Sequence, residues 1–534
     1  MPIIESRVDT TSAQFKQNRE EMLARVAEFR AIEDKGRKEE ESKRERFHKR
    51  GQLLPRERVH LMLDRGSPWL ELQTLCGYKM HDDKDGSLAG GNTIMGIGYV
   101  SGTRCMVTAS NFAIKGGTMT PWGVQKTLRI QDICMEQKLP AVSMIESGGA
   151  NLLYQAELFI PGGKTFANQA RMSALGLPQV TVVHGSSTAG GAYMPGLSDY
   201  TVMIRKNAKV FLAGPPLVKA ATGEDVTVDE LGGCDMHTSI SGTADYPASS
   251  EEEAIAIARD IVGQFKRPDK SRIEWLPPEA PYYDPAELYG VLPRDIKQGF
   301  DMREVIARLV DGSRFHEYQP NYGKTLICGY AHLWGYKIGI LANNGVLFND
   351  SALKGAHFIE LCNQNRTPIL FLQNITGFMV GKEYEQRGIT KDGAKMIMAV
   401  SNSEVPKFTV MCHGSFGAGN YGMSGRAFDS RFLFSWPQSQ ISVMGAEQAA
   451  NTLAEVKIRQ LARHGKQLTA EEVAAIREPV VAEFKRKSSA YYSTSEIWDD
   501  GILDPVDTRN ALGIAISAAL NTPIGDPRYG IFRM

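Results

Sequence analysis

Hydrophobic and polar positions follow two different patterns along this chain. From about residue 12 to 67, apolar residues recur at helical spacing among many charged residues, as in segment 39–46, EEESKRER. This pattern predicts a solvated helical arm, which we place at residues 1–67. From Gly96 onward, short β-branched runs such as 179–183 alternate with small-residue turns and helical stretches such as 125–135. Strands that alternate with helices indicate an α/β fold.

The α/β part of the chain repeats itself. Segment 138–150, KLPAVSMIESGGA, is echoed by segment 366–378, RTPILFLQNITGF. The apolar run that follows Pro178 is echoed after Pro406, at the same separation in sequence. A separation shared by two distant stretches predicts two homologous domains joined head to tail.

A proline-rich segment marks the junction between the copies. Residues 275–285 contain four prolines in eleven positions. Proline removes a backbone donor and fixes φ, so this segment is a poor helix or strand but a good linker. We therefore assign residues 68–280 to an N-terminal domain and residues 281–534 to a C-terminal domain. The second domain is expected to contain a helical region around residues 446–461.

The composition is that of an ordinary globular protein, with 42% hydrophobic residues, 61 acidic residues and 61 basic residues. A net charge of zero gives no reason to expect nucleic acid or an acidic membrane surface as a partner. The seven cysteines form no C-x-x-C pair, which predicts reduced thiols rather than disulfides or a zinc site. No signal-like N-terminus and no apolar run of about 18 residues is present, so we expect a cytoplasmic enzyme.

Each copy ends its second apolar run in a turn of small residues, 188–193 (TAGGAY) and 416–421 (FGAGNY). Small residues allow a ligand oxygen to reach peptide N–H groups, as in an oxyanion hole, where one donor contributes about 3–4 kcal/mol. A lone turn of this kind is usually an ordinary strand-to-helix connection. Its repetition at equivalent positions favours two similar binding sites.

Other catalytic motifs are missing from the two turns. Neither turn fits the dinucleotide or P-loop pattern, so no ATP is expected on this chain. No nearby serine lies in G-x-S-x-G, and no acidic or histidine cluster has metal-ligand spacing, so no metal is expected. His184 and His413 stand at matching ends of the apolar runs, and we interpret them as structural. Two oxyanion holes without an acid, a base or a metal imply that the reacting ligands bring their own chemistry.

The two turns, together with segments 211–224 (FLAGPPLVKAATGE) and 370–381 (LFLQNITGFMVG), resemble a known family. This family is the carboxyltransferase β subunit of biotin-dependent acyl-CoA carboxylases, in the 3-methylcrotonyl-CoA and geranyl-CoA branch. The resemblance extends from about residue 15 to the C-terminus. It implies two tandem crotonase-like domains of repeated ββα units, of which the N-terminal one binds acyl-CoA and the C-terminal one binds carboxybiotin.

The resemblance implies a role for each turn. The amides of Gly190 and Gly191 would hold the thioester oxygen as an enolate forms, and those of Ala418 and Gly419 would hold the ureido oxygen of biotin. We expect Gly191→Val to abolish turnover by blocking the ligand while leaving the fold largely intact. The remaining residues of the thioester site would be Gly148, Gly149, Ala150, Gly162, Gly163, Phe166, Ala192 and Tyr193. Those of the biotin site would be Thr376, Gly377, Phe378, Phe416, Gly417 and Asn420.

The resemblance also implies partners. The chain has no Met-Lys-Met biotinylation site and no biotin carboxylase half. Both are therefore expected on a separate α subunit, which carries the biotin and assembles around a β hexamer. The active site is expected between the N-terminal domain of one β subunit and the C-terminal domain of its neighbour.

The implied reaction is carboxylation of the γ carbon of a β-methyl-α,β-unsaturated acyl-CoA. Between Gln155 and Asn168 this chain lacks the longer segment, with extra aromatic and charged residues, that is typical of methylcrotonyl-specific relatives. Gly162 and Gly163 in this segment carry no side chain, which leaves room for a longer acyl group, so we expect geranyl-CoA as the substrate. Carboxylation of 3-methylcrotonyl-CoA is the alternative, since a shortened surface loop would explain the same difference. A biotin-independent crotonase-like hydratase, isomerase or decarboxylase is a remoter alternative.

Overall fold

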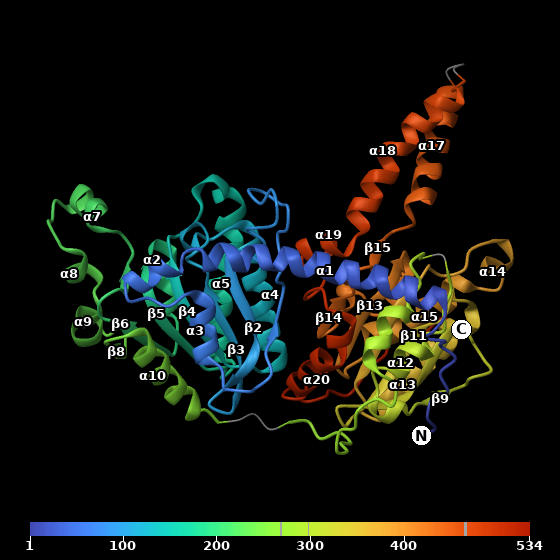
Figure 1. Ribbon diagram of the computed structural model, residues 1–534, viewed down its shortest axis with the longest axis horizontal. Coiled ribbons are helices and arrows are strands. Elements are labelled where there is room, and N and C mark those ends of the chain that lie inside the picture. The colour runs from blue at the N-terminus through green and yellow to red at the C-terminus, as the bar shows by residue number, and fades with distance from the viewer. Residues whose placement is uncertain (267–269, 297, 464–466) are drawn as a thin grey trace. The chain divides into compact units, whose positions relative to one another are not determined.

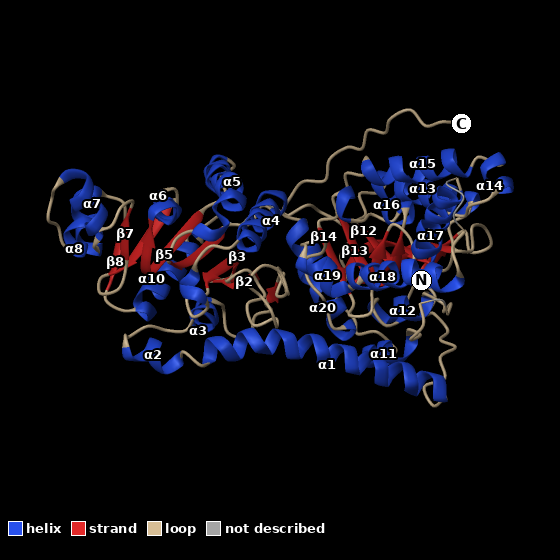
Figure 2. Ribbon diagram, turned by 90° about the horizontal axis from the view of Figure 1, so that it is seen from above, coloured by secondary structure: helices blue, strands red, loops and turns tan. Residues whose placement is uncertain are grey.

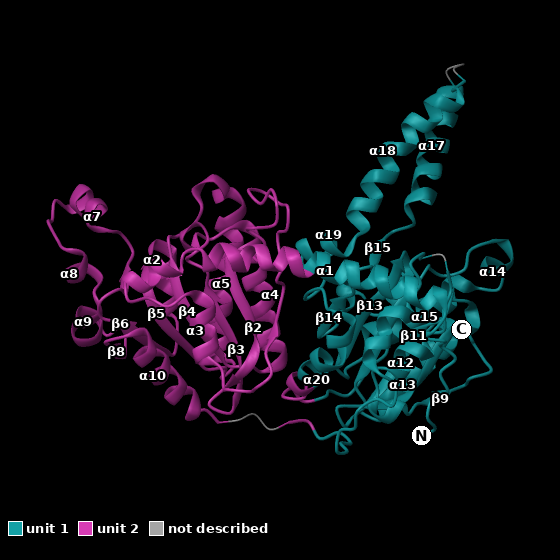
Figure 3. Cartoon of the chain, in the orientation of Figure 1, with its two compact units in different colours: residues 1–29, 272–516, 524–534 teal, residues 30–271, 517–523 magenta. Residues whose placement is uncertain are grey.

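The computed structural model of the chain describes residues 1–266, 270–296, 298–463 and 467–534. These residues form two compact units (Figure 3). Unit 1 contains residues 1–29, 272–516 and 524–534, and unit 2 contains residues 30–271 and 517–523. The chain passes from unit 2 to unit 1 next to the proline-rich segment, in which residues 276–284 form neither helix nor strand.

Unit 2 is built on an eight-stranded sheet among its described residues. Its strands are β1 (Leu70–Glu71), β2 (Thr93–Val100), β3 (Thr103–Ser110), β4 (Ala141–Ser147), β5 (Gln179–Thr188), β6 (Tyr200–Ile204), β7 (Lys209–Phe211) and β8 (Tyr246–Ala248). Its helices are α2 (Arg44–Lys49), α3 (Pro55–Met62), α4 (Pro121–Gln137), α5 (Gln155–Ala174), α6 (Tyr193–Gly196), α7 (Pro215–Thr222), α8 (Val228–Gly232), α9 (Cys234–Met236) and α10 (Glu251–Gly263). β2 and β3 form an antiparallel hairpin, and β3 to β6 run parallel. Figure 2 shows α4 and α5 on one face of this sheet and α3 on the other.

Unit 1 repeats this architecture on a seven-stranded sheet among its described residues. Its strands are β9 (His316–Tyr318), β10 (Leu326–Leu333), β11 (Tyr336–Asn343), β12 (Ile369–Ile375), β13 (Lys407–Phe416), β14 (Phe432–Ser435) and β15 (Gln440–Ser442). Its helices are α11 (Leu288–Val291), α12 (Arg303–Ala307), α13 (Asn349–Gln364), α14 (Lys382–Gln386), α15 (Ile389–Ser401), α16 (Ala418–Gly422), α17 (Ala446–Ala462), α18 (Ala470–Ser488), α19 (Ala490–Ser495) and α20 (Thr508–Ala519). β10 and β11 are antiparallel, and β11 to β14 run parallel. The predicted helical region around 446–461 is α17, which projects from this unit with α18 as a hairpin (Figure 1).

The helix that crosses each sheet has clear start and stop signals. In unit 2, α4 begins after Thr120, whose side chain accepts a hydrogen bond from the Gly123 amide, and Pro121 occupies its first turn. This arrangement satisfies one free N–H group and uses proline where its missing donor costs nothing. α4 ends at Lys138 in the left-handed conformation, and Arg366 adopts the same conformation after α13. The same stop signal therefore precedes β4 and β12, the equivalent strands of the two units.

The N-terminal helices differ from the expected solvated arm. The predicted helical segment forms α1 (Ala13–Glu41), α2 and α3. Met22 and Phe29 of α1 are only 1% and 0% exposed, and Val59 and Met62 of α3 belong to the core of unit 2. Burial of these apolar residues makes the helices parts of the two units rather than an arm, because their apolar stripe needs a packing partner.

All seven cysteines are buried and unpaired in the structure. None of the described helices combines the length and the hydropathy that crossing a bilayer requires.

Candidate functional site

The first predicted turn lies where β5 of unit 2 ends. Ala189 has a positive φ of 52° and turns the chain out of the strand into a short 3₁₀ turn, 189–192. Gly190 is exposed and Gly191 is buried. The Ser187 hydroxyl donates a hydrogen bond of 2.9 Å to the Gly191 carbonyl, which fixes the turn to the strand that precedes it.

The second predicted turn lies at the end of β13 of unit 1. Gly417 has φ 58° and ψ −152°, a backbone conformation that strongly favours glycine, and α16 follows it directly. Ala418 is exposed and Gly419 is buried, which is the same pattern as in the first turn. A hydrogen bond of 2.8 Å fixes the Asn420 side chain, whose Nδ2 donates to Ser415 Oγ. Ser415 Oγ in turn donates to Gln373 Oε1 at 2.6 Å.

The strand pairing makes the two turns equivalent residue by residue. Ser187 pairs with Ser147 in unit 2, and Ser415 pairs with Ile375 in unit 1, after the same register shift in both sheets. Gly191 therefore corresponds to Gly419. Counting back along the strands, His184 corresponds to Cys412, so the prediction that His184 and His413 occupy matching positions is wrong by one residue.

Each turn presents two backbone donors. The amides of Gly190, Gly191, Ala418 and Gly419 have no acceptor within the described part of the chain. They are the first residues of helical turns, where N–H groups have no partner in the helix itself. The geometry thus provides, in each unit, a pair of adjacent donors for a ligand oxygen.

A second loop in each unit, whose residues were also predicted to belong to the sites, is fixed by a backbone hydrogen bond. In unit 2 the Met119 amide donates to the Gly149 carbonyl at 2.9 Å, and in unit 1 the Leu347 amide donates to the Gly377 carbonyl at 3.1 Å. Sequence reasoning missed Met119 and Leu347, which carry no motif. Their effect is to fix the loops that hold Gly148, Gly149 and Ala150 in unit 2 and Thr376, Gly377 and Phe378 in unit 1.

The amides of the first loop are already used within the protein. The Gly148 amide donates to the Gly116 carbonyl at 3.0 Å, and the Gly149 amide donates to Ser147 Oγ at 3.1 Å. These two glycines line the region beside the turn without offering it further backbone donors. In unit 1, a Cβ built on Gly419 would lie 3.3 Å from the Gly377 Cα, so the loop and the turn are in contact there.

The structure brings α5 against the first turn. The rings of Phe166 and Tyr193 are 5.8 Å apart, and a Cβ built on Gly190 would lie 3.7 Å from the Phe166 ring. Gly162 and Gly163 lie one turn earlier on the same helix, and no atom lies within 4 Å of a Cβ built on either. The segment between Gln155 and Asn168 is therefore helical rather than a surface loop.

A buried charge cluster behind the first turn was missed by sequence reasoning, because its members are far apart in the chain. Arg58 of α3, which is fully buried, pairs with Glu146 at 3.0 Å and with Glu251 at 2.8 Å. His184 Nδ1 lies 3.2 Å from Glu251 Oε1. Burial opposes ionisation of Glu251, but its contacts with His184 and Arg58 lower the pKa of this carboxyl below the usual range. The cluster ties the ends of β4 and β5 to α3 and α10.

Because His184 and His413 are buried, we expect the stability of the protein to depend on pH. The pKa values of His184 and His413 are lowered from 6.5 to about 4, by burial first and then by the nearby charges of Arg58 and Arg25. Between these pKa values the unfolded chain binds more protons than the folded one, so acidification favours unfolding. We expect the free energy of unfolding to fall as the pH drops from 6.5 to about 4, with the full value present above 6.5.

The variant His413→Asn should lose less free energy of unfolding on acidification than wild type. The difference should be on the order of 3 kcal/mol near pH 4, because the variant has no imidazole to protonate at this position. The measurement is the urea midpoint of the chain at several pH values in this range, for wild type and variant. Identical pH dependence in the two proteins would contradict the prediction.

Comparison with known proteins gives consistent matches over the whole chain. Residues 46–529 match the family model described as carboxyl transferase domain. The probable methylcrotonoyl-CoA carboxylase beta chain, mitochondrial, of Drosophila melanogaster is 48% identical over 552 residues, covering 100% of this chain and 95% of the relative. The biotin-dependent 3-methylcrotonyl-coenzyme A carboxylase beta1 subunit of Mycobacterium tuberculosis is 49% identical, covering 92% of this chain and 93% of the relative.

Among solved structures, the crystal structure of the geranyl-CoA carboxylase beta subunit of P. aeruginosa superposes with a TM-score of 0.90. The two sequences are 46% identical, and the match covers 99% of each chain. The repeated sheets, the equivalent turns and these matches agree with one another.

Proposed function

Because the chain belongs to the carboxyl transferase family, as the β subunit of a biotin-dependent acyl-CoA carboxylase, we propose that it carboxylates geranyl-CoA. The predicted fold of two tandem crotonase-like domains is confirmed by the repeated sheets and the match to a β subunit over 99% of the chain. The observation that carries the proposed reaction is the equivalence of the two turns, each with two amide donors that no described residue engages.

We assign the thioester to the turn of unit 2. The amides of Gly190 and Gly191 would donate to the thioester oxygen, and their hydrogen bonds would strengthen as negative charge develops on it. In a conjugated thioester this charge extends along the double bond, so donors at the oxygen also acidify the γ carbon. Ser187 contributes by holding the Gly191 carbonyl, which keeps the donors in place as the charge develops.

We assign the biotin of the partner subunit to the turn of unit 1. The residues present fit a ureido oxygen, because Ala418 is exposed with a free amide and Gly419 has no side chain to cover its own amide. When bound, carboxylated biotin supplies the carboxyl group that is transferred. Asn420, Ser415 and Gln373 form a buried chain of hydrogen bonds under the turn, which limits movement of the two donors.

The choice of geranyl-CoA rests on α5. Gly162 and Phe166 are four residues apart, so they lie on one face of the helix, and Phe166 lies beside the turn. The open space around a Cβ built on Gly162 leaves this face uncovered in front of the turn. The names of the relatives point to both substrates: methylcrotonoyl-CoA and 3-methylcrotonyl-coenzyme A appear in the names of one relative each, and geranyl-CoA appears in the name of the solved structure. Carboxylation of 3-methylcrotonyl-CoA is therefore the second candidate.

The test is bicarbonate fixation by the chain reconstituted with its biotin-bearing partner, with each thioester in turn. We expect wild type to use geranyl-CoA, and Gly162→Phe to lower kcat/KM for it by about 10–200-fold, because an added ring removes space that the longer chain needs. The same variant should change kcat/KM for 3-methylcrotonyl-CoA by less than about threefold. Turnover of only the short thioester by wild type would overturn the choice of geranyl-CoA.

We further propose that the chain forms the hexameric core of a complex with an α subunit that carries biotin carboxylase and biotin. Family membership supports this assembly, since the chain itself contains no biotinylation motif. Co-purification of a biotinylated subunit, followed by light scattering of the complex, tests both statements. A cytoplasmic location is part of the same proposal.

A further inference from the structure

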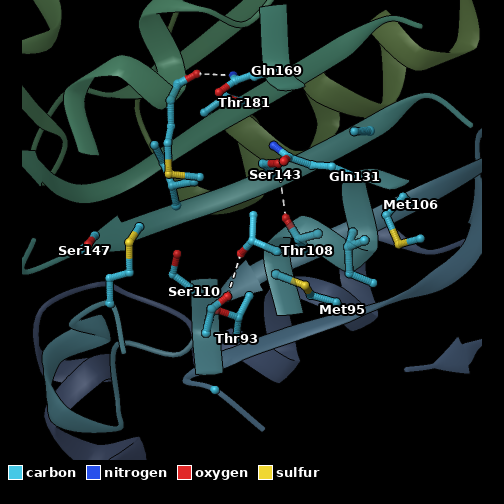
Figure 4. A pocket seen from close by; sticks show the side chains of 18 of the residues that line it. Thr93, Met95, Met106, Thr108, Ser110, Gln131, Ser143, Ser147, Gln169 and Thr181 are labelled. Atoms are coloured by element: carbon cyan, nitrogen blue, oxygen red, sulfur yellow. Dashed lines mark hydrogen bonds between the residues drawn. The ribbon is translucent and has the colours of Figure 1, made fainter. Parts of the chain in front are cut away.

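One side chain of the buried charge cluster lies against the strand that leads to the first turn. Glu146 is the last residue but one of β4, and it is 3% exposed. Ser143 and Ser147 of the same strand line a cavity of about 110 Å³ on the face covered by α4 and α5 (Figure 4). Because side chains alternate along a strand, Glu146 points to the opposite face, toward α3 and α10.

Glu146 faces a bulge in β5. The register of the two strands shifts at this point, so Glu146 alone stands opposite residues 184–186. Extra residues on one strand bend it and re-aim the groups that follow. The turn with the amides of Gly190 and Gly191 follows a few residues later, so the bend decides where these donors point.

The carboxylate of Glu146 holds this bulge. A Cβ built on Gly185 would overlap Oε1 of Glu146, so the carboxylate lies against the backbone of the bulge and occupies the place of a side chain. Oε1 accepts a hydrogen bond of 3.0 Å from Gln52 Nε2, and Oε2 accepts one of 3.0 Å from the Arg58 guanidinium. Gln52 Nε2 also lies 3.5 Å from the His184 carbonyl oxygen. The carboxylate is thus fixed at both oxygens and touches the bulge at its centre.

Unit 1 forms the same bulge with different residues. The register of β12 and β13 shifts at the equivalent point, where Asn374 takes the place of Glu146 and His413 takes that of Gly185. His413 is 2% exposed, and burial lowers its pKa to about 4, so the imidazole is neutral above this pH. The bulge therefore carries its own uncharged side chain in unit 1 and takes a carboxylate from the neighbouring strand in unit 2.

The ionic cluster is more than this bulge needs for folding. Buried ion pairs are often no more stabilising than uncharged side chains of similar volume, and unit 1 builds the bulge with such side chains. The cluster adds rigidity, because Arg58 joins Glu146 at 3.0 Å to Glu251 at 2.8 Å, and each member of such a network loses its partner if the strand moves. Rigidity matters most beside a reacting group, where a displacement of about 1 Å can cost about 10²-fold in rate.

We propose that Glu146 is a positioning residue of the thioester site, which sets the bend of β5 and thereby directs the amides of Gly190 and Gly191 toward the thioester oxygen. It acts through the bulge and not by contact with the substrate. The inference rests on the proposed function and adds the residue that aims the two donors. Its loss should affect the reaction more than binding of the uncharged thioester, because the amides bond most strongly to the charge that develops on the oxygen.

The variant that tests this role is Glu146→Gln, which keeps the size of the side chain and removes the charge that Arg58 binds. The matched control is Glu71→Gln on β1 of the same unit, since Glu71 pairs with Arg56 at 2.9 Å. Gln52→Leu removes the hydrogen bond to Oε1 and decides the question if Glu146→Gln fails to fold. Each variant is measured by thermal unfolding, by the dissociation constant of the thioester that wild type carboxylates, and by kcat of the reconstituted holoenzyme.

We expect Glu146→Gln to lower kcat by about 10²-fold and to keep the dissociation constant within about threefold of wild type. Gln52→Leu should lower kcat by about five- to tenfold, the effect of one lost hydrogen bond. Glu71→Gln should lower the unfolding temperature at unchanged kcat. The inference is overturned if the folded variants of Glu146 and Gln52 turn over as the control does, or if only binding of the thioester is lost. Wild-type enzyme that carboxylates neither thioester would instead overturn the proposed function.

Discussion

Gly419→Ala is expected to lower kcat for bicarbonate fixation by about 10²–10³-fold, the effect of losing one oxyanion-hole donor. A Cβ at this position would overlap Cγ1 of Ile375, which is itself 0% exposed and packed in the core of unit 1. Neither atom has room to move, so the turn must shift and carry its amides away from the bound oxygen. The measurement is kcat with the biotin-bearing partner, together with the dissociation constant of geranyl-CoA by calorimetry.

The assignment of this turn to biotin predicts that the dissociation constant of geranyl-CoA stays within about twofold of wild type, since the thioester is assigned to the other unit. A second substitution offers a rescue. Ile375→Ser introduces the residue found at the equivalent position of unit 2, Ser147, and removes the overlapping atoms. The double variant should recover part of the lost kcat. A single variant with activity close to wild type would refute the role of the turn.

Gly191→Val is expected to reduce kcat/KM for geranyl-CoA by about 10²–10³-fold. The structure changes the reason that the sequence offered for this effect. A Cβ on Gly191 would lie 3.3 Å from Ser187 Oγ, so the valine side chain points into the protein and not toward the ligand. Its methyl groups would break the hydrogen bond from Ser187 to the Gly191 carbonyl and displace the donor amides.

The matched control for this variant is Gly196→Ala, at the end of α6, where no atom lies within 4 Å of the added Cβ. Gly196→Ala should keep wild-type activity. Crowding in Gly191→Val should cost about 1–3 kcal/mol of stability, which thermal unfolding of both variants would measure. If Gly191→Val retains turnover, the amide donors of unit 2 are not the site of the thioester oxygen.

Buried polar side chains hold both turns in place through hydrogen bonds. A substitution in either turn should therefore disturb mainly the amide donors next to it. In unit 1 the turn is held by the hydrogen bonds that join Asn420, Ser415 and Gln373. In unit 2 it is held by the hydrogen bond from Ser187, and the charge cluster of Arg58 lies behind the strand. Such networks fix one geometry, because each member loses its partner if the turn moves. The two units hold these donors through equivalent serines, Ser187 and Ser415, which have different hydrogen-bond partners.

The repeat, the α/β class and the two glycine-rich turns follow from local patterns in the amino-acid sequence. These features are local: a β-branched run, a small-residue turn and a proline-rich segment each act on the backbone nearby, and their spacing recurs in the second copy. The sequence also placed Phe166 near the turn through its resemblance to the carboxyltransferases. The confirmed identity of the chain as a carboxyltransferase β subunit follows from the same motifs.

Which amides lie free at the two turns became clear from the tertiary structure. The separation of His184 and His413 is 229 residues, one more than the 228 residues between Pro178 and Pro406, and strand register shows that the smaller value applies to the strands. Gly148 and Gly149 resemble the donor glycines in sequence, yet their amides are bonded to Gly116 and Ser147. The bond to Gly116 joins two distant parts of the chain, so no local sequence pattern reveals it.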